Sequence, residues 1–446
     1  YGSCFRVWHG GHITVKNGVC REAMGEGIAF YGGGPGGGGE PGIQINNNTV
    51  ERFEIFDTGR AWVDGGGFGN NLGMSIILKN CNDCVVRGNR VRNSYGSAIS
   101  VTTSENPGLQ SNNVLVEQNT ISNFGYLDRA FGGRDSAGIH FEPQTNNGIR
   151  GGIILNNEIY GGAVTHEEWS NGIRVSAGGW TPVTGLLIIN NSMNDLNGAC
   201  IDLQENPAPA TIRNNAMHNC SKQGPTCGGA RCNLYVDPSN HTHTNNSYWA
   251  AGGSDVVVNI WGGSQFTRTS VLSYEASAVQ ADPLYVSPTD LRLQGASPLI
   301  DAGSDADCPA ADRDGVPRPI DGRCDVGAFE NVITVKIDIR PGSSPNLVNL
   351  RVQDAVPVAI FSDETFDATT VDPATVTLAS ALGKLRGYGR HTAVVQDVNS
   401  DGRRDLLLHV STSAHQLNET DAEAVLMGKT YAGRTIRGLD TIRVLP

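Results

Sequence analysis

Apolar and polar side chains alternate in residues 135–143, which read DSAGIHFEP. A period of two is typical of a half-buried β-strand, because successive side chains of a strand point to opposite faces. We therefore expect Ile139 and Phe141 to face a hydrophobic core, and His140 and Glu142 to lie together on the outer face. The pattern predicts a strand that carries two ionisable side chains on one surface.

A two-part pattern recurs over much of the chain. In each copy an apolar strand leads into Asn-Asn or a close variant, and a second strand led by Gly or Ala follows. The copies begin with HITVKNGVC, GIQINNNTVERF, CVVRGNRVRNS, VLVEQNTISNF, IILNNEIYGG, LLIINNSMNDL and ATIRNNAMHNC. Such self-similarity, interrupted by Gly-rich or polar insertions, indicates a solenoid whose coils stack strand upon strand.

The recurring Asn residues have a physical role in such a solenoid. An Asn in the turn of one coil can hydrogen-bond the Asn residues of the coils above and below it, which forms a ladder. Asn also tolerates the left-handed backbone that these turns need. The sequence therefore predicts an Asn ladder along one turn of the solenoid.

With these repeats, residues 11–330 resemble the right-handed parallel β-helix superfamily, which includes pectate lyases and many secreted polysaccharide enzymes. Residues 281–330, from ADPLYVSPTD to DVGAFE, resemble the segment that closes many secreted bacterial members. The resemblance implies an all-β fold, with a right-handed parallel β-helix over residues 1–330. It specifies the fold and leaves the chemistry open, because one fold hosts many functions.

The composition changes after Glu330. The stretch VITVKIDIRPGSSPNLVNL alternates like strands, contains Pro-Gly turns and lacks the Asn pattern. Residues 331–446 are therefore expected to form a small β-sandwich domain, which resembles a C-terminal module appended to many secreted prokaryotic proteins.

The segment DVNSDGRRD in this module has the spacing of a calcium loop. Asp397, Asn399, Asp401, the carbonyl of Arg403 and Asp405 stand at positions 1, 3, 5, 7 and 9 of such a loop. Gly402 at position 6 permits the turn. The twelfth position is Leu408, where an EF-hand has Glu. This departure favours a dockerin-like or β-sandwich loop with another closing ligand. The alternative is a hairpin turn without an ion.

Composition and charge narrow the functional classes. Of 446 residues, 57 are Gly and 17% are charged, which favours many short strands and tight turns. The net charge of −12 argues against a nucleic-acid partner, because a chain without basic clusters cannot replace phosphate counterions. There is no run of about 18 apolar residues, so no transmembrane segment is expected. The chain begins at Tyr1 with neither Met nor signal peptide, as a processed secreted protein or a fragment would.

The ten Cys residues stand in closely spaced pairs, which suggests disulfides and an oxidising compartment. Cys200–Cys220 and Cys308–Cys324 are two pairings that the spacing suggests. Metal binding is the alternative for Cys81 and Cys84, but no second CxxC motif accompanies them, as a zinc site would need. We expect a secreted, extracellular or cell-surface protein.

When the second strands of the copies are aligned, polar and ionisable side chains fall in two outward columns. The first column holds Ser100, His140, Arg174, Asp202 and Tyr235. The second column holds Thr102, Glu142, Ser176, Gln204 and Asp237. Two insertions, GYLDRAFGGRDS and GGAVTHEEWS, precede two of these strands. They are expected to form the sides of a cleft whose floor is the sheet. The alternative is that the columns are ordinary cross-strand polar pairs on the outside of a solenoid.

The columns supply candidate residues for carbohydrate chemistry. The candidate catalytic residues are His140, Glu142, Arg174 and Asp202. The candidate substrate-binding residues are Trp169, Gln204, Tyr235 and Asp237, with Trp169 expected to stack on a sugar ring. A lyase needs a base, an acid and a neutralising cation, roles that Arg174 with His140 or Tyr235 could fill. A glycoside hydrolase needs two carboxylates, for which Glu142, Asp202 and Asp237 are available, although no Asp-Asp pair occurs.

Three functions remain compatible with the sequence. They are a carbohydrate-active enzyme, a non-catalytic polysaccharide-binding protein or adhesin, and a structural subunit of an extracellular fibre or surface layer. The outward columns favour action on, or binding of, a polysaccharide. Rigidity and the open ends of a solenoid favour a structural subunit, because uncapped coils pair with another subunit.

Overall fold

The computed structural model is almost entirely β-structure and divides into two compact units, Tyr1–Asn331 and Val332–Pro446. The residues that it describes are 2–32, 43–59, 73–104, 108–125, 136–143, 147–162, 170–176, 181–206, 208–221, 227, 232–251, 256–349, 355–379, 381–382, 385–386, 390–391, 393–411, 417–419 and 421–445. No α-helix occurs among these residues.

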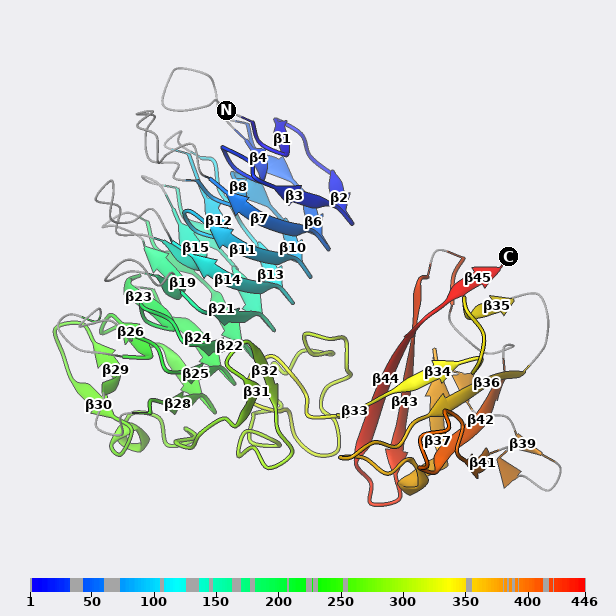
Figure 1. Cartoon of the computed structure of the whole chain (residues 1–446). Helices are drawn as coiled ribbons and strands as arrows, with labels where there is room; N and C mark the ends of the chain where they lie inside the picture. The colour runs from blue at the N-terminus through cyan, green and yellow to red at the C-terminus, as the bar shows by residue number, and fades with distance from the viewer. Residues whose placement is uncertain are drawn as a thin grey trace. The chain divides into compact units, whose positions relative to one another are not determined.

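Three long sheets run along the first unit, and each coil from β1 to β28 contributes one strand to each sheet, while β29 and β30 extend sheet A alone (Figure 1). Sheet A contains β1 (Phe5–Trp8), β4 (Ile28–Tyr31), β8 (Ile76–Lys79), β12 (Ile99–Thr102), β15 (Ala137–Glu142), β19 (Asn171–Ser176), β23 (Ile201–Glu205), β26 (Leu234–Val236), β29 (Val256–Ile260) and β30 (Gln265–Thr267). Sheet B contains β2 (Thr14–Lys16), β6 (Thr49–Glu51), β10 (Val85–Arg87), β13 (Leu115–Glu117), β17 (Ile153–Leu155), β21 (Leu186–Ile189), β24 (Ala210–Arg213) and β27 (Thr242–Thr244). Sheet C contains β3 (Val19–Arg21), β7 (Glu54–Thr58), β11 (Arg90–Ser94), β14 (Thr120–Phe124), β18 (Glu158–Tyr160), β22 (Ser192–Asn194), β25 (Ala216–His218) and β28 (Ser247–Trp249).

Neighbouring strands in the three sheets are parallel, except that β30 pairs antiparallel with β29. Short pairs join β5 (Ile45–Asn46) to β9 (Cys81–Asn82), β16 (Ile149–Arg150) to β20 (Val183–Thr184), and β31 (Tyr285–Ser287) to β32 (Asp290–Leu293). This is the predicted parallel β-helix.

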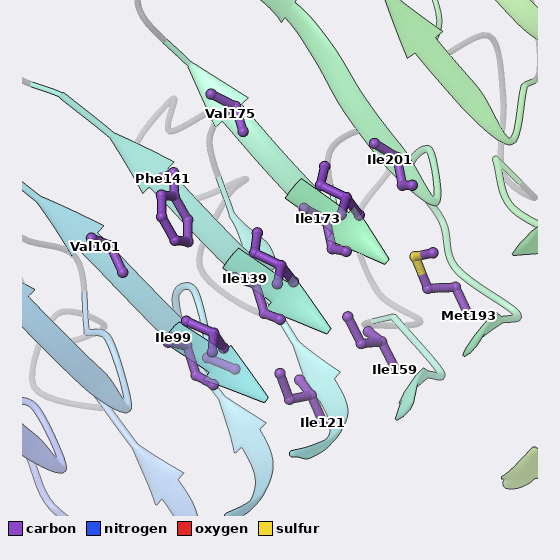
Figure 2. Packing of buried hydrophobic residues seen from close by; sticks show 14 of the residues in the cluster. Ile99, Val101, Ile121, Ile139, Phe141, Ile159, Ile173, Val175, Met193 and Ile201 are labelled. Carbon is purple, nitrogen blue, oxygen red and sulfur yellow. The ribbon is translucent and has the colours of Figure 1, made fainter. Parts of the chain in front are cut away.

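The inward side chains of sheet A stack in register. Ile99 pairs with Ile139, Ile139 with Ile173, and Ile173 with Ile201. All four side chains are fully buried, and Figure 2 shows them lined up with residues of sheet C such as Ile121. Burying an Ile side chain stabilises a fold by about 1.5–3 kcal/mol, so the stack is a main source of stability. The inward and outward faces predicted from alternation are confirmed.

The predicted Asn ladder runs along the turn between sheets B and C. In each step the side-chain amide of one Asn donates to Oδ1 of the Asn in the next coil, over 2.9–3.1 Å. The ladder comprises Asn89, Asn119, Asn157, Asn191, Asn215 and Asn246, and it ends on the carboxylate of Glu275. The left-handed backbone falls on the residue before each ladder Asn, for example Asn156 and Asn190. The ladder is confirmed.

Five disulfides join all ten Cys residues in closely spaced pairs. They are Cys4–Cys20, Cys81–Cys84, Cys200–Cys220, Cys227–Cys232 and Cys308–Cys324. The two pairings suggested by spacing, Cys200–Cys220 and Cys308–Cys324, are confirmed. Cys81 and Cys84 bond to each other, so they are not zinc ligands.

The second unit is a sandwich with one hydrophobic core. One sheet contains β33 (Ile333–Val335), β44 (Thr435–Thr441), β43 (Glu423–Thr430), β37 (Val371–Leu378) and β38 (Ala381–Leu382). The other contains β34 (Ile337–Ile339), β36 (Ala355–Ile360), β42 (Asp405–Ser411) and β41 (Ala393–Gln396). Two short pairs complete it, β35 (Leu347–Asn349) with β45 (Arg443–Leu445) and β39 (Leu385–Arg386) with β40 (Arg390–His391).

Candidate functional site

The first outward column of sheet A forms as predicted. His140 on β15 pairs with Arg174 on β19, which pairs with Asp202 on β23, and Asp202 pairs with Tyr235 on β26. We call the complete column the outer row. It consists of Arg6, Ala29, Ile77, Ser100, His140, Arg174, Asp202, Tyr235 and Asn259.

The expectation that this column lies open on the surface is not met. The exposed fractions of His140, Arg174, Asp202 and Tyr235 are only 1%, 3%, 2% and 2%. The alternation of the strands fixed their direction, but direction away from the core does not require contact with solvent. A ligand therefore cannot approach these four side chains without displacing what covers them.

The buried polar groups bond to one another. His140 Nε2 lies 2.7 Å from the Ser176 hydroxyl. Arg174 Nη1 donates to Asp202 Oδ2 over 3.3 Å, and Asn171 Nδ2 donates to the same oxygen over 3.2 Å. Arg174 therefore neutralises a buried carboxylate, which Asn171 holds in place.

The burial of Arg174 changes the expected effect of removing it. An exposed ion pair contributes about 0–1 kcal/mol to stability, and at that value an alanine variant would keep its fold. Breaking a buried pair instead costs about 3–5 kcal/mol, because the partner charge stays buried without compensation. Arg174→Ala is therefore not a clean test of catalysis, and loss of activity in it would not identify a catalytic residue.

The second column departs from the predicted register. Ser176 on β19 pairs with Glu205 on β23, and an irregularity in the pairing lies between Arg174 and Ser176. The sequence alignment had placed Gln204 opposite Ser176. Because the extra residue of a β-bulge is not marked by composition, the alignment of the copies gave no signal of this shift. The structure does not describe the Gln204 side chain.

Glu205 is the functional candidate that the alignment missed. Its Oε2 lies 3.6 Å from Arg174 Nη2, and its side chain is 37% exposed. Glu142 is also half-buried rather than buried, and its carbonyl accepts a hydrogen bond from the Thr102 hydroxyl over 2.8 Å. Phe141 pairs with Val175, so the next position on each strand places Glu142 beside Ser176. We call Glu142, Ser176 and Glu205 the carboxylate row.

Tyr235 and Asp237 have contacts that favour structural roles. Tyr235 packs against the Cys227–Cys232 disulfide, and its pKa is raised by burial and by the negative charge of Asp202. Asp237 accepts hydrogen bonds from the Ser239 hydroxyl over 2.6 Å and from His241 Nε2 over 2.8 Å. His241 Nδ1 accepts from a backbone N–H, so Nε2 carries the ring proton. Asp237 thus orders the turn after β26.

Trp169, the predicted sugar platform, lies outside the described residues, as do most residues of the two insertions expected to form walls. Their contribution to a cleft stays a prediction.

The predicted calcium loop, Asp397–Asp405, forms a turn with several backbone hydrogen bonds to its carboxylates. Asp397 accepts from the N–H groups of Asp401 and Gly402 over 3.2 and 2.9 Å. Asp405 is fully buried, and its two oxygens accept from the N–H groups of Ser362 and Val398, both over 2.9 Å. The carboxylates of Asp397 and Asp405 thus hold the backbone of the turn through hydrogen bonds.

Among the described residues, no group of three or more His, Cys, Asp and Glu side chains is arranged to hold a metal. Calcium at Asp397, Asn399, Asp401, Arg403 and Asp405 stays a prediction.

One comparison with known proteins bears on this arrangement. A protein-family model described as "Right handed beta helix region" matches residues 2–175 and, in an overlapping match, residues 68–266. The two matches together span more than half of the chain. No curated protein matches the sequence significantly. Within the described part of the chain, no helix has the length and apolar character to cross a membrane.

Proposed function

The chain belongs to the right-handed β-helix family, and from that premise we propose that it binds and cleaves an extracellular polysaccharide on the outer face of sheet A. The observation that carries the proposal is the carboxylate row. Glu142 and Glu205 are both partly exposed carboxylates, and they lie on the two strands that neighbour the strand of Ser176.

The separation of the two carboxylates favours hydrolysis with inversion. Their strands β15 and β23 are separated by β19 alone, and a strand spacing of about 4.8 Å puts their backbones about 10 Å apart. Inverting glycosidases hold their carboxyl groups about 6.5–9.5 Å apart, which leaves room for the attacking water. One carboxyl group would protonate the leaving oxygen while the other activates that water.

The lyase alternative has less support. Arg174 is buried, and its two terminal nitrogens face Asp202 and Glu205. Its guanidinium is charged at all ordinary pH values, so it does not serve as a proton acceptor there. Its suggested role is to hold Glu205 in position.

An extracellular location is part of the proposal. The five disulfides support it, because such bonds persist in oxidising compartments and are rare in the cytosol.

The test is a panel of neutral and acidic polysaccharides. We expect new reducing ends without an unsaturated product, and NMR of the first product should show an inverted anomeric centre. Glu205→Gln and Glu142→Gln should each lower the rate by about 100-fold or more, as loss of a general acid or base does. Glu54→Gln, which alters an exposed carboxylate of sheet C, should keep the full rate. An unsaturated product would identify a lyase, and full activity in both variants would refute the assignment of these residues.

A structural role in a fibre or surface layer is the second candidate, favoured by the burial of His140, Arg174 and Asp202. On this hypothesis the outer row stiffens the solenoid, and the end strands β1, β2 and β3 pair with another subunit. Phe5, Trp8 and Val19 on these strands are 38%, 36% and 65% exposed. Sedimentation at increasing concentration, together with absence of turnover on the panel, would favour this candidate.

A further inference from the structure

Residues 301–331, which we call the strap, run as irregular backbone along the turn between sheets B and C. Five consecutive coils hold the strap in the same way. In each of them the residue before the ladder Asn donates its side-chain amide to a strap carbonyl over 2.8–2.9 Å. The donors are Gln118, Asn156, Asn190, Asn214 and Asn245, and the acceptors are the carbonyls of Asp312, Ala311, Asp325, Ser304 and Ala302, respectively. These bonds join neutral groups, so they do not themselves respond to pH.

Three carboxyl groups are buried inside the strap, those of Asp312, Asp325 and Glu330. They are linked in series, because the Asp325 N–H donates to Glu330 Oε1 over 2.9 Å and the Glu330 N–H donates to Asp312 Oδ2 over 2.8 Å. The shape of the strap therefore depends on these three groups. Their remaining oxygens accept the N–H groups of Asp301, Val316, Ile320 and Asn331.

One guanidinium compensates the three carboxyl groups. Arg318 Nε lies 3.5 Å from Glu330 Oε1, and both side chains are fully buried. Among the described residues, Arg318 is the cation in ion-pair contact with the three groups, through Glu330. When all three groups are ionised, three negative charges are buried with one positive charge. An uncompensated charge in such a place carries a large desolvation cost.

The groups packed around the three carboxyl groups do not correct this imbalance. Asp301 and Asp314 face them within the strap and add negative charge. Asp314 is in turn paired with Arg292 and Arg313. The coils beneath the strap offer Asn and Gln amides, which are neutral. Taking up protons is therefore how the strap reduces its buried charge.

The direction of the pH effect follows from the same burial. Burial raises the pKa of Asp325 to about 6, and burial with repulsion from Asp325 raises that of Glu330 to about 7. The closed strap thus holds these protons more tightly than an open strap, in which the groups return to their ordinary pKa values. The resulting stabilisation of the closed strap is complete below about pH 4 and is lost as the pH rises through about 6–7.

We propose that the strap is a pH-dependent latch, which closes on the turn between sheets B and C while its buried carboxyl groups hold protons and opens locally as they ionise. Opening is local because Val326 and Phe329 pack in a small core of their own, separate from the main core of the coils. Asn331, whose N–H Asp325 Oδ2 holds over 2.7 Å, is the last residue of the first unit. The latch therefore also sets where the connection to the second unit begins.

The experiment is hydrogen exchange of the full-length chain, followed by mass spectrometry between pH 5 and pH 8.5 and corrected for the intrinsic rate at each pH. Strap peptides are compared with peptides that contain the ladder residues Asn157 and Asn191. Glu330→Gln removes one of the buried charges. The matched control is Asp314→Asn, which removes a strap carboxylate that Arg292 and Arg313 already compensate.

The opening equilibrium of the strap should rise about tenfold or more from pH 5.5 to pH 8, while the ladder peptides keep their protection. Glu330→Gln should remove most of this rise, and Asp314→Asn should keep it. The rise is a ratio within one variant, so a variant that opens more at every pH still gives a valid result. Strap protection that is unchanged between the two pH values, an equal loss in the ladder peptides, or a full rise in Glu330→Gln would each overturn the proposal.

Discussion

Replacing Arg174 by Ala should destabilise the solenoid strongly, although Arg174 is on the outer face of sheet A. The side chains of Arg174 and Asp202 are 4% and 3% exposed, and 3.3 Å separates Nη1 from Oδ2. Removing the guanidinium leaves the Asp202 charge buried without the cation that neutralises it, which costs about 3–5 kcal/mol.

The size of the thermal shift follows from the length of the unit. The unfolding entropy is about 2.1 cal/mol/K per residue. Over the first unit, a loss of about 3–5 kcal/mol in unfolding free energy therefore lowers the Tm by about 4–7 °C. Circular dichroism and calorimetry on the full chain would measure the shift. Arg87→Ala is the matched control, because Arg87 also pairs across neighbouring strands, with Glu117, but is 42% exposed. The control should lose less than about 1 kcal/mol.

A second substitution separates lost charge compensation from lost packing. Asp202→Asn removes the carboxylate charge that Arg174 neutralises in the wild type, so the double variant Arg174→Ala with Asp202→Asn should be more stable than Arg174→Ala alone. The reasoning would be refuted if Arg174→Ala melts within 1 °C of the wild type, or if the double variant is less stable than Arg174→Ala alone.

Three further predictions concern other parts of the chain. Asn157→Ala removes the ladder partner of Asn119 and Asn191, so several buried polar groups lose their hydrogen bonds. It should lower the unfolding free energy by about 3 kcal/mol or more in a denaturant titration. A loss below about 1 kcal/mol would contradict the proposed role of the ladder in stability. Burial raises the pKa of Asp325 to about 6 and, with repulsion from Asp325, that of Glu330 to about 7. A raised carboxyl pKa means that the folded state holds the proton more tightly, so this contribution to stability is complete below about pH 4 and is lost as pH rises through about 6–7. The Tm of the first unit should therefore be higher at pH 5 than at pH 8, and the opposite trend would refute the reasoning. Asp397→Ala should lower the Tm of the second unit in chelator, because its carboxylate holds the N–H groups of the turn, and it should lower the Tm further in calcium if the loop binds the ion. Equal losses in calcium and in chelator would show that the loop is a turn without an ion.

The sequence by itself determined which residues face the core and which turns repeat. Alternation is a local property, because each side chain of a strand points opposite to the one before it. It therefore placed Ile139 inside and His140 outside, and it aligned His140 with Arg174 and Asp202 on neighbouring strands. The Asn pattern likewise predicted the ladder, because each coil presents the same group to the next.

Only the tertiary structure decided how the outward groups are used. Whether Arg174 reaches solvent depends on what covers sheet A, and the pairing of Glu205 with Ser176 depends on a local irregularity between two coils. In the second unit, the Ile339 N–H on β34 donates to Asp440 Oδ2 on β44 over 2.7 Å, although the two residues are about a hundred positions apart in the chain. Burial, register shifts and long-range contacts arise from the packing of distant segments, and a periodic local pattern does not encode them.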